Sequence, residues 1–471
     1  MNWVITIGLE THVQLNTESK IFSGAPTKFG SPPNSQASFI DLALPGVLPV
    51  INRKAVEYAI RFGLATGGKI NSNSIFARKN YFYPDLPKGY QISQFEHPII
   101  EGGAIKIRDN DKTVRLTRAH LEEDAGKSLH DKHPTQSGID LNRAGTPLLE
   151  IVTEPDIESS EEAVNYAKTL HELVTWIGIC SGNMQEGNFR CDANVSIKDA
   201  KSSKLGTRRE IKNLNSFRFL KAAIDYEVDW QIAQLEDGNK IEQATVLYDS
   251  IKNETRLMRS KEDAHDYRYF PCPDLLKMEL EREWVDKIRN NLPELPDQKQ
   301  SRFIDDFNIT PYDAEVIIAE QVTAEFFEAI ATNSDGKIAA NLLINELFGR
   351  LNKDNLSFTE NPITVKQMRE LIDLIKLEKI SSKGAKEIFD HIWKSGGNPT
   401  ELVDELGLLQ VQDTSLIEKI VDDVIKENPA QVNKVKSNPK LIGWFVGQVM
   451  KKSEGKADPK IINQIVSEKL N

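Results

Sequence analysis

The stretch that decides the fold is IGLETHVQL, at residues 7–15. Polar and apolar side chains alternate along it, which is the period of a β-strand with one buried face. The alternation places three polar side chains on the other face: Glu10, His12 and Gln14. The Cα atoms of Glu10 and His12 would then lie about 7 Å apart, so that both side chains can reach one cation. A polar sheet face that is only solvated is the alternative.

The segment around this strand, residues 1 to about 290, has a mixed α and β pattern. Further strands are expected at residues 105–108 and 113–116, where apolar residues again alternate with polar ones. A helix is expected after Pro155: Ser159 begins a capping-box pattern, an apolar stripe follows, and Gly178 is the stop signal.

The hydrophobic period changes to 3.6 beyond a proline-rich linker at residues 293–296. One helical stripe consists of Met368, Leu371, Ile372 and Ile375. The pattern predicts the α+β class, with a mixed α/β domain at 1–292, a helical domain at 293–406 and a small all-α tail at 407–471.

Charge and composition limit the class of protein. The chain has 471 residues, 39% of them hydrophobic, and 59 basic against 70 acidic residues. It has no apolar run of the roughly 18 residues that span a membrane, no basic N-terminal region of a signal peptide, and only three cysteines. We therefore expect a cytoplasmic protein. Residues 431–471 hold eight lysines and three acidic residues, a net charge of +5, which suits either a polyanion contact or a solvated helical surface.

Carboxylates and cations recur in the first 290 residues. An acidic cluster, HLEED, occupies residues 120–124, and Glu150 interrupts an apolar run, where an unpaired buried carboxylate would be costly. A salt bridge to Arg143 is one explanation, and Mg²⁺-ATP chemistry is another. Basic and aromatic residues interleave at residues 78–90, in a pattern that can clamp phosphates. The AGKS at residues 125–128 is not a P-loop, because Leu121 stands at the first glycine position.

Seven motifs together resemble one family. They are IGLETHVQL (7–15), RKNYFYPDLPKGYQIS (78–93), HLEEDAGK (120–127), EIVTEPD (150–156), RCDANV (190–195), EIKNLNSF (210–217) and DYRYFP (266–271). From residue 3 to its end, the chain is similar to the B subunits of bacterial aspartyl/glutamyl-tRNA amidotransferases.

The resemblance implies a tRNA-dependent, ATP-dependent carbon–nitrogen ligase with glutamine as amido donor. Such a protein uses ATP and Mg²⁺ to phosphorylate the side-chain carboxylate of Glu-tRNA(Gln), Asp-tRNA(Asn) or both. Ammonia from the amidase (A) subunit then displaces phosphate, and the small (C) subunit is the third member of the heterotrimer. The family's fold is a cradle-shaped catalytic domain followed by a helical domain and a helical tail.

The resemblance also assigns site residues. Those expected at the catalytic and Mg²⁺ site are Glu10, His12, Glu123 and Glu150, with Lys79 also catalytic. The expected ATP-binding residues are Lys79, Tyr81, Lys88, Arg190, Asp192, Asn194 and Lys212. The tail residues expected to bind tRNA are Lys451, Lys452 and Lys456. Many relatives carry four zinc-binding cysteines in the first loop region, where this chain has Ser23, Ala25, Ser38 and Asp41.

These four residues cannot build a tetrahedral thiolate site, so we predict no structural zinc and expect packing alone to hold this loop. Cys191 is expected to be a buried small residue, not a nucleophile. A non-catalytic tRNA-binding adaptor remains the alternative function. A related archaeal protein, the E subunit of a glutamyl-tRNA amidotransferase, carries an inserted domain, for which residues 249–271 leave no room.

Overall fold

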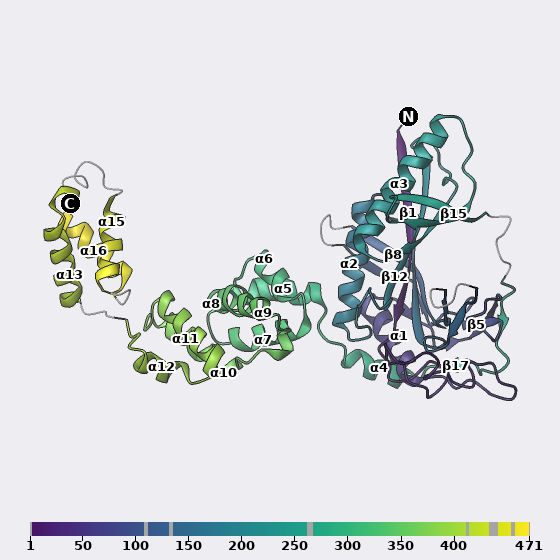
Figure 1. The fold of residues 1–471 in the computed structure, drawn as a ribbon, viewed down its shortest axis with the longest axis horizontal. Helices are drawn as coiled ribbons and strands as arrows, with labels where there is room; N and C mark the ends of the chain where they lie inside the picture. Colours follow the sequence, from purple (N-terminus) through teal and green to yellow (C-terminus); the bar gives the residue numbers. More distant parts are fainter. Residues whose placement is uncertain are drawn as a thin grey trace. The chain divides into compact units, whose positions relative to one another are not determined.

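The computed structural model describes residues 2–107, 112–130, 135–260, 267–410, 414–432, 441–453 and 457–470. The chain divides into two compact units, Met1–Leu295 and Pro296–Asn471, which are described separately (Figure 1). The division falls within the proline-rich linker.

The first unit is organised around a sheet that has ten strands in the described residues. The strand order is β15-β14-β13-β12-β1-β11-β8-β6-β2, and β7 pairs with β8 beside this path. The bounds are β1 (Trp3–Gln14), β2 (Lys69–Ile70), β6 (Ile100–Glu101), β7 (Ala104–Lys106), β8 (Thr113–Glu123), β11 (Pro147–Thr153), β12 (Phe189–Asp199), β13 (Arg209–Leu214), β14 (Ala244–Asp249) and β15 (Glu254–Ser260). All these neighbours are antiparallel except β13 and β14.

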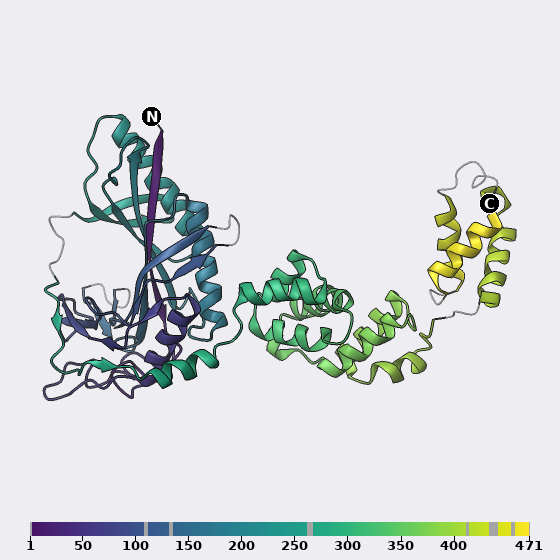
Figure 2. The ribbon, with the colours of Figure 1, turned by 180° about the vertical axis from the view of Figure 1, so that it is seen from behind.

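Helices cover one face of this sheet (Figure 1, Figure 2). They are α1 (Arg53–Ala65), α2 (Ser160–Trp176) and α3 (Phe217–Glu236). The alternate residues Leu9, Thr11 and Val13 of β1 are fully buried, whereas the residues between them are only partly buried. The strand and its two faces predicted at residues 7–15 are therefore confirmed.

Smaller strands and a long loop complete the unit. β16 (Phe270–Pro271), β4 (Ala77–Asn80) and β5 (Tyr90–Ser93) pair in one small sheet. The remaining elements are β3 (Asn73–Ser74), β9 (Lys127–Leu129), β10 (Gly138–Asp140), β17 (Met278–Glu279) and α4 (Arg282–Asn290).

The loop before α1 is held by a buried ion pair. Nζ of Lys20 lies 2.6 Å from Oδ2 of Asp41, and both side chains are almost completely excluded from solvent. The same Asp41 oxygen accepts a hydrogen bond from the backbone N–H of Ser38 at 2.7 Å. The expectation that packing alone holds this loop is therefore wrong, because Asp41 serves as the acceptor for a buried cation.

In its described residues, the second unit consists of helices and their connecting loops, with one isolated β-bridge between Ile380 and Leu409. Its helices are α5 (Pro296–Phe307), α6 (Pro311–Ile317), α7 (Gln321–Ala331), α8 (Gly336–Asn341), a π-helical turn η2 (Leu342–Leu347), α9 (Phe348–Asp354), a 3₁₀ turn η3 (Phe358–Glu360), α10 (Val365–Lys376), α11 (Ser382–Ser395), α12 (Pro399–Glu405), α13 (Thr414–Glu427), α15 (Ile442–Lys452) and α16 (Pro459–Leu470). The last three helices enclose a core that includes Val421, Phe445 and Val466. None of the helices within the described ranges combines the length and apolarity that crossing a bilayer requires.

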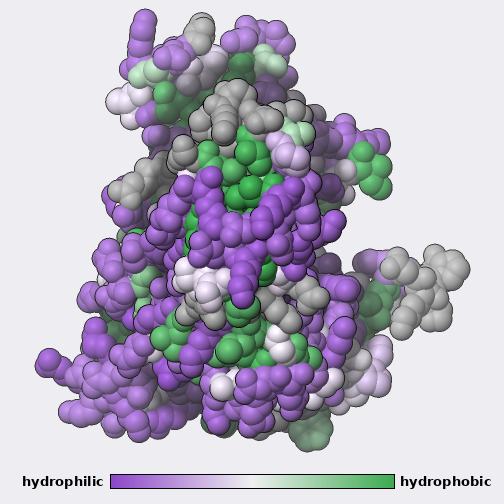
Figure 3. Space-filling model, turned by 90° about the vertical axis from the view of Figure 1, so that its left-hand side faces the viewer, coloured by the Kyte–Doolittle hydropathy of each residue, from purple (hydrophilic) through white to green (hydrophobic). Residues whose placement is uncertain are grey.

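The α+β class predicted from the sequence is confirmed. The helix expected after Pro155 is α2, whose N-cap Ser159 accepts from the backbone N–H of Glu162 at 3.1 Å. The predicted stripe lies on α10, with Met368 and Leu371 buried. The separation of a tail at residue 407 stays a prediction. Hydrophilic side chains cover most of the face in Figure 3, with apolar patches between them.

Candidate active site

The face of the large sheet opposite the helices carries a row of polar side chains. Cross-strand pairing sets His12 of β1 opposite Glu150 of β11 and opposite Arg190 of β12. Glu150 is in turn opposite His120 of β8. Directly paired residues point to the same side of a sheet, so adjacent strands place these groups together. Local alternation within each strand thus produces a continuous polar surface.

A compact cluster of an imidazole and two carboxylates lies at the centre of this surface. Nε2 of His12 is 3.4 Å from Oε1 of Glu122 and 3.5 Å from Oε2 of Glu150. One potential ligand atom from each of the three residues lies within 4.8 Å of the others. We call His12, Glu122 and Glu150 the carboxylate cluster.

A second imidazole lies against this cluster. Nε2 of His120 is 3.4 Å from Oε2 of Glu150 and 3.9 Å from Oε2 of Glu122. The His120 side chain is buried, and its Nδ1 has no hydrogen-bond partner among the described residues. Nε2 of His120 therefore faces both carboxylates of the cluster.

The electrostatics of the cluster favour a cation. Burial lowers the pKa of His12, but the carboxylates of Glu122 and Glu150 outweigh that effect and raise it to about 10. Burial raises the pKa of Glu150, whereas the neighbouring His120 and His12 hold it well below its usual value. When His12 gives up its Nε2 proton, this nitrogen and the two carboxylates form a donor set that suits a divalent metal ion. The residues present therefore fit the Mg²⁺ that the resemblance implies, with oxygen as the main ligand type.

Lys79 reaches toward the cluster from the small sheet. Its Nζ lies 5.0 Å from the centroid of the Tyr267 ring. Burial lowers the pKa of Lys79, yet the negative charges of Glu122 and Glu150 raise it far above the ordinary lysine value. Lys79 is therefore a permanent cation beside the carboxylate cluster. Tyr81, two residues further, donates its hydroxyl to Oε1 of Gln91 at 3.3 Å.

Glu10 lies on the same face and is held by the adjacent strand. The side-chain amide of Asn194 donates to Oε1 of Glu10 at 2.9 Å. Burial and the negative charges of Glu150 and Glu210 raise the pKa of Glu10. Nζ of Lys212 lies 2.6 Å from Asp192 and 2.7 Å from Glu210. The structure thus gathers Glu10, Asp192, Asn194 and Lys212 along the edge of the carboxylate cluster.

Glu123 has a different environment from the other predicted metal ligands. Its carboxylate accepts from Nζ of Lys88 at 2.6 Å and from the backbone N–H of Ile92 at 2.8 Å. Arg190 donates to the next residue, Asp124, at 2.9 Å. The structure therefore does not bring Glu123 into the carboxylate cluster, where Glu122 stands in its place. The sequence offered Arg143 as a partner of Glu150, but that guanidinium lies against Asp124 instead.

Comparison with known proteins follows the same division of the chain. Residues 5–286 match a model of the GatB/GatE catalytic domain, and residues 325–470 match a model of the GatB domain. The chain belongs to the GatB family. The catalytic-domain match includes the carboxylate cluster, Lys79 and the predicted ATP-binding residues.

Full-length relatives agree with this assignment to the GatB family. The chain is 55% identical over 479 residues to a protein of Dechloromonas aromatica, with 99% of both chains covered. It is 54% identical to one of Cupriavidus metallidurans and 55% identical to one of Thiobacillus denitrificans, with 100% of both chains covered in each pair. All three relatives are named for the B subunit of aspartyl/glutamyl-tRNA(Asn/Gln) amidotransferase.

The lysines predicted to bind tRNA lie within the region that matches the GatB domain. Lys451 and Lys452 end α15, and both are exposed. Nζ of Lys452 lies 2.7 Å from Oε1 of Glu427, so this cation already has an acidic neighbour. Lys456 lies outside the described residues.

Two residues of the candidate site were missed from the sequence: Glu122 and His120. Both belong to the HLEED motif, and both lie on the polar face of β8 because they are two residues apart. The alternation of side chains along the strand could have indicated that His120 and Glu122 share a face. It separates His120 and Glu122 from Glu123, but it does not say which set faces His12.

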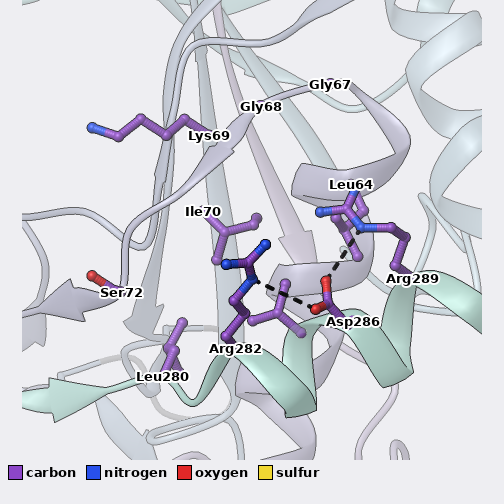
Figure 4. Close-up of a pocket in the computed structure, with 11 residues that line it drawn as sticks. Leu64, Gly67, Gly68, Lys69, Ile70, Ser72, Leu280, Arg282, Asp286 and Arg289 are labelled. Carbon is purple, nitrogen blue, oxygen red and sulfur yellow. Dashed lines mark ion pairs between the residues drawn. The ribbon is translucent and has the colours of Figure 1, made fainter.

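A separate hollow in the same unit contains none of the predicted site residues. It encloses about 470 Å³ between the end of α1, the turn at Gly67 and Gly68, and α4 (Figure 4). Asp286 lies 3.8 Å from both Arg282 and Arg289. Because its lining includes no residue of the carboxylate cluster, this hollow is not part of the candidate site.

Proposed function

We propose that this chain is the catalytic B subunit of a glutamine-dependent tRNA amidotransferase. Its substrates would be Glu-tRNA(Gln), Asp-tRNA(Asn) or both, and its partners would be the amidase (A) and small (C) subunits. The observation that supports this most strongly is the carboxylate cluster with Lys79, within the match to the GatB/GatE catalytic domain. The names of the relatives support the tRNA-dependent reaction and a complex of several subunits.

The proposed chemistry has two steps. The side-chain carboxylate of the misacylated amino acid attacks the γ-phosphorus of ATP, forming an acyl phosphate and releasing ADP. Ammonia, which the amidase releases from glutamine, then attacks the acyl carbon; phosphate leaves, and the nitrogen loses a proton. Activation is needed because a carboxylate is a poor electrophile, whereas an acyl phosphate has a good leaving group.

The chain's own residues suit the first step. His12, Glu122 and Glu150 would hold Mg²⁺, which supplies charge neutralisation at the phosphates when bound. Lys79 provides a positive charge beside them, and, despite its burial, the charges of Glu122 and Glu150 raise its pKa above the ordinary lysine value. Arg190 and Lys212 add cations along the same face, although each is already paired with a carboxylate. Phosphate oxygens would compete for these cations on binding.

The test measures ADP release by the complete complex, with and without Glu-tRNA(Gln). We expect release that depends on the mischarged tRNA in the wild type and is absent in Glu150→Ala. The matched control is Glu101→Ala, which removes an exposed carboxylate of β6 that pairs with Lys69 at the surface. If the wild type binds tRNA without any such release, the adaptor function is correct instead. If Glu150→Ala retains tRNA-dependent ADP release, the kinase step does not depend on the carboxylate cluster.

A further inference from the structure

A row of aromatic rings runs beside the carboxylate cluster. The rings of Tyr83 and Tyr81 meet edge to face with centroids 5.9 Å apart, and those of Tyr81 and Tyr267 do so at 6.1 Å. The row continues to Tyr269 at 6.1 Å and ends at Phe95, whose ring stacks on Tyr269 at 4.3 Å with an interplanar angle of 7°. We call these five rings the aromatic row. They come from the loop after β4, the loop after β5 and the segment before β16.

The aromatic row is adjacent to the cluster at two points. In its middle, Nζ of Lys79 lies over the ring of Tyr267, and the charges of Glu122 and Glu150 act on that same Nζ. At its end, the hydroxyl of Ser93, two residues before Phe95, donates to Oε2 of Glu122 at 3.2 Å. A ligand seated on the row therefore has part of its length within reach of the carboxylates.

The two ends of the row are open to solvent. Tyr83 is 51% exposed and Phe95 is 43% exposed, and Phe82 beside Tyr83 is 86% exposed. The guanidinium carbon of Arg118 lies 5.9 Å from the Phe95 ring, and its buried Nε has no hydrogen-bond partner among the described residues. Exposed aromatic side chains next to cations are typical of surfaces that bind unpaired nucleotides.

We propose that the aromatic row is a stacking platform for the unpaired nucleobases at the 3′ end of the aminoacyl-tRNA. This inference rests on the proposed function, because it takes aminoacyl-tRNA as the substrate. The amino acid is esterified to the 3′-terminal ribose, so its carboxylate reaches the cluster only if the terminal bases lie immediately beside it. Aromatic rings and a guanidinium plane accept the face of any base, and the nearby cations complement the phosphates.

The experiment compares two RNA minihelices that reproduce a tRNA acceptor stem, one with the unpaired 3′ end and one blunt. We expect the full chain to bind the first about tenfold more tightly, since base–aromatic stacking is of that order. The double variant Phe95→Ala/Tyr83→Ala should lose this preference. The matched control Phe29→Ala/Phe39→Ala removes two similarly exposed rings, 65% and 68% exposed, from the loop before α1, and should keep it. Phe95→Trp retains a ring face and should bind as the wild type does.

Each other result overturns the inference. If the double variant weakens both RNAs equally, or neither, the row does not bind the 3′ end. If it weakens ATP binding and leaves the RNA preference intact, the base seated on the row belongs to ATP. Failure of the proposed function is distinguishable: the wild-type complex would then release no ADP in response to mischarged tRNA. If the chain binds both minihelices equally tightly and the complex shows tRNA-dependent ADP release, only the proposal that the aromatic row binds the 3′ end is contradicted.

Discussion

Nε2 of His12 lies 3.4 Å from Oε1 of Glu122, although strand β11 runs between β1 and β8. The contact is possible because both side chains reach across β11 on the open face of the sheet, where they meet Glu150. Three adjacent antiparallel strands thus supply one residue each to the cluster, and long-range pairing assembles the site.

The first prediction separates Glu122 from its neighbour Glu123. Glu122→Gln should weaken the binding of a divalent ion at least tenfold, since it removes a charged oxygen ligand from the cluster. A Mn²⁺ titration of the purified chain measures this. Glu123→Gln is the control: ion affinity should not change, but the chain should lose about 3–5 kcal/mol of stability, because Lys88 is left buried without its partner. The reverse pattern would contradict the cluster.

The second prediction concerns the ion pair of the loop before α1. Lys20→Met should lower the free energy of unfolding by about 3–5 kcal/mol, because the carboxylate of Asp41 stays buried without a cation. Chemical denaturation measures the loss. Lys20→Met/Asp41→Asn removes both charges and should recover most of it. A loop that contributes little to folding would give the wild-type midpoint in both variants.

The third prediction is that the chain holds no structural zinc. Of the four residues at the positions of the zinc cysteines, Asp41 is the one with a charged oxygen, and Lys20 already occupies it. Removal of zinc with a zinc-selective chelator should therefore leave the denaturation midpoint of the wild type unchanged. Metal analysis that finds one tightly bound zinc per chain would refute the prediction.

The fourth prediction concerns the buried thiols. Burial raises the pKa of Cys191 to about 12 and that of Cys180 to about 11. Both thiols are protonated at pH 8, so labelling by a thiol reagent should be slow in the native chain and fast in denaturant. The pKa of the Cys191 thiol is about 9 in the unfolded chain and higher in the folded chain. Its contribution to the stability of the folded state is therefore complete below about pH 9 and is lost as the pH rises toward about 12. Between about pH 9 and 12, the free energy of unfolding of Cys191→Ala should therefore fall less steeply with pH than that of the wild type. The difference in slope should be at most about 1.4 kcal/mol per pH unit.

The fifth prediction compares two adjacent lysines of the tail. Lys451→Ala should weaken tRNA binding and reduce the slope of log affinity against log salt by about one, as expected for a lost phosphate contact. Lys452→Ala should have a smaller effect, because Glu427 already neutralises that cation at 2.7 Å. Equal salt slopes for the wild type and both variants would show that this end of α15 does not contact the RNA.

Local patterns explain what could be predicted from sequence. The alternation at residues 7–15 identified β1 and the shared face of Glu10 and His12, since neighbouring side chains of a strand must point in opposite directions. Ser159 marked the start of α2 and Gly178 its end. These ends could be predicted because N-caps favour serine and left-handed conformations favour glycine. The seven motifs placed the chain in its family.

The tertiary structure alone decided which carboxylates meet. Glu122 and Glu123 are chemically equivalent, and a shift of one residue between β8 and β11 would exchange their faces. The partners Lys20 and Asp41 are also indistinguishable in sequence from solvated surface charges until the loop closes around them. Sequence by itself determined the elements and the family, because both depend on local residue patterns. Strand register and burial selected the members of the site, because they depend on contacts between residues far apart in the chain.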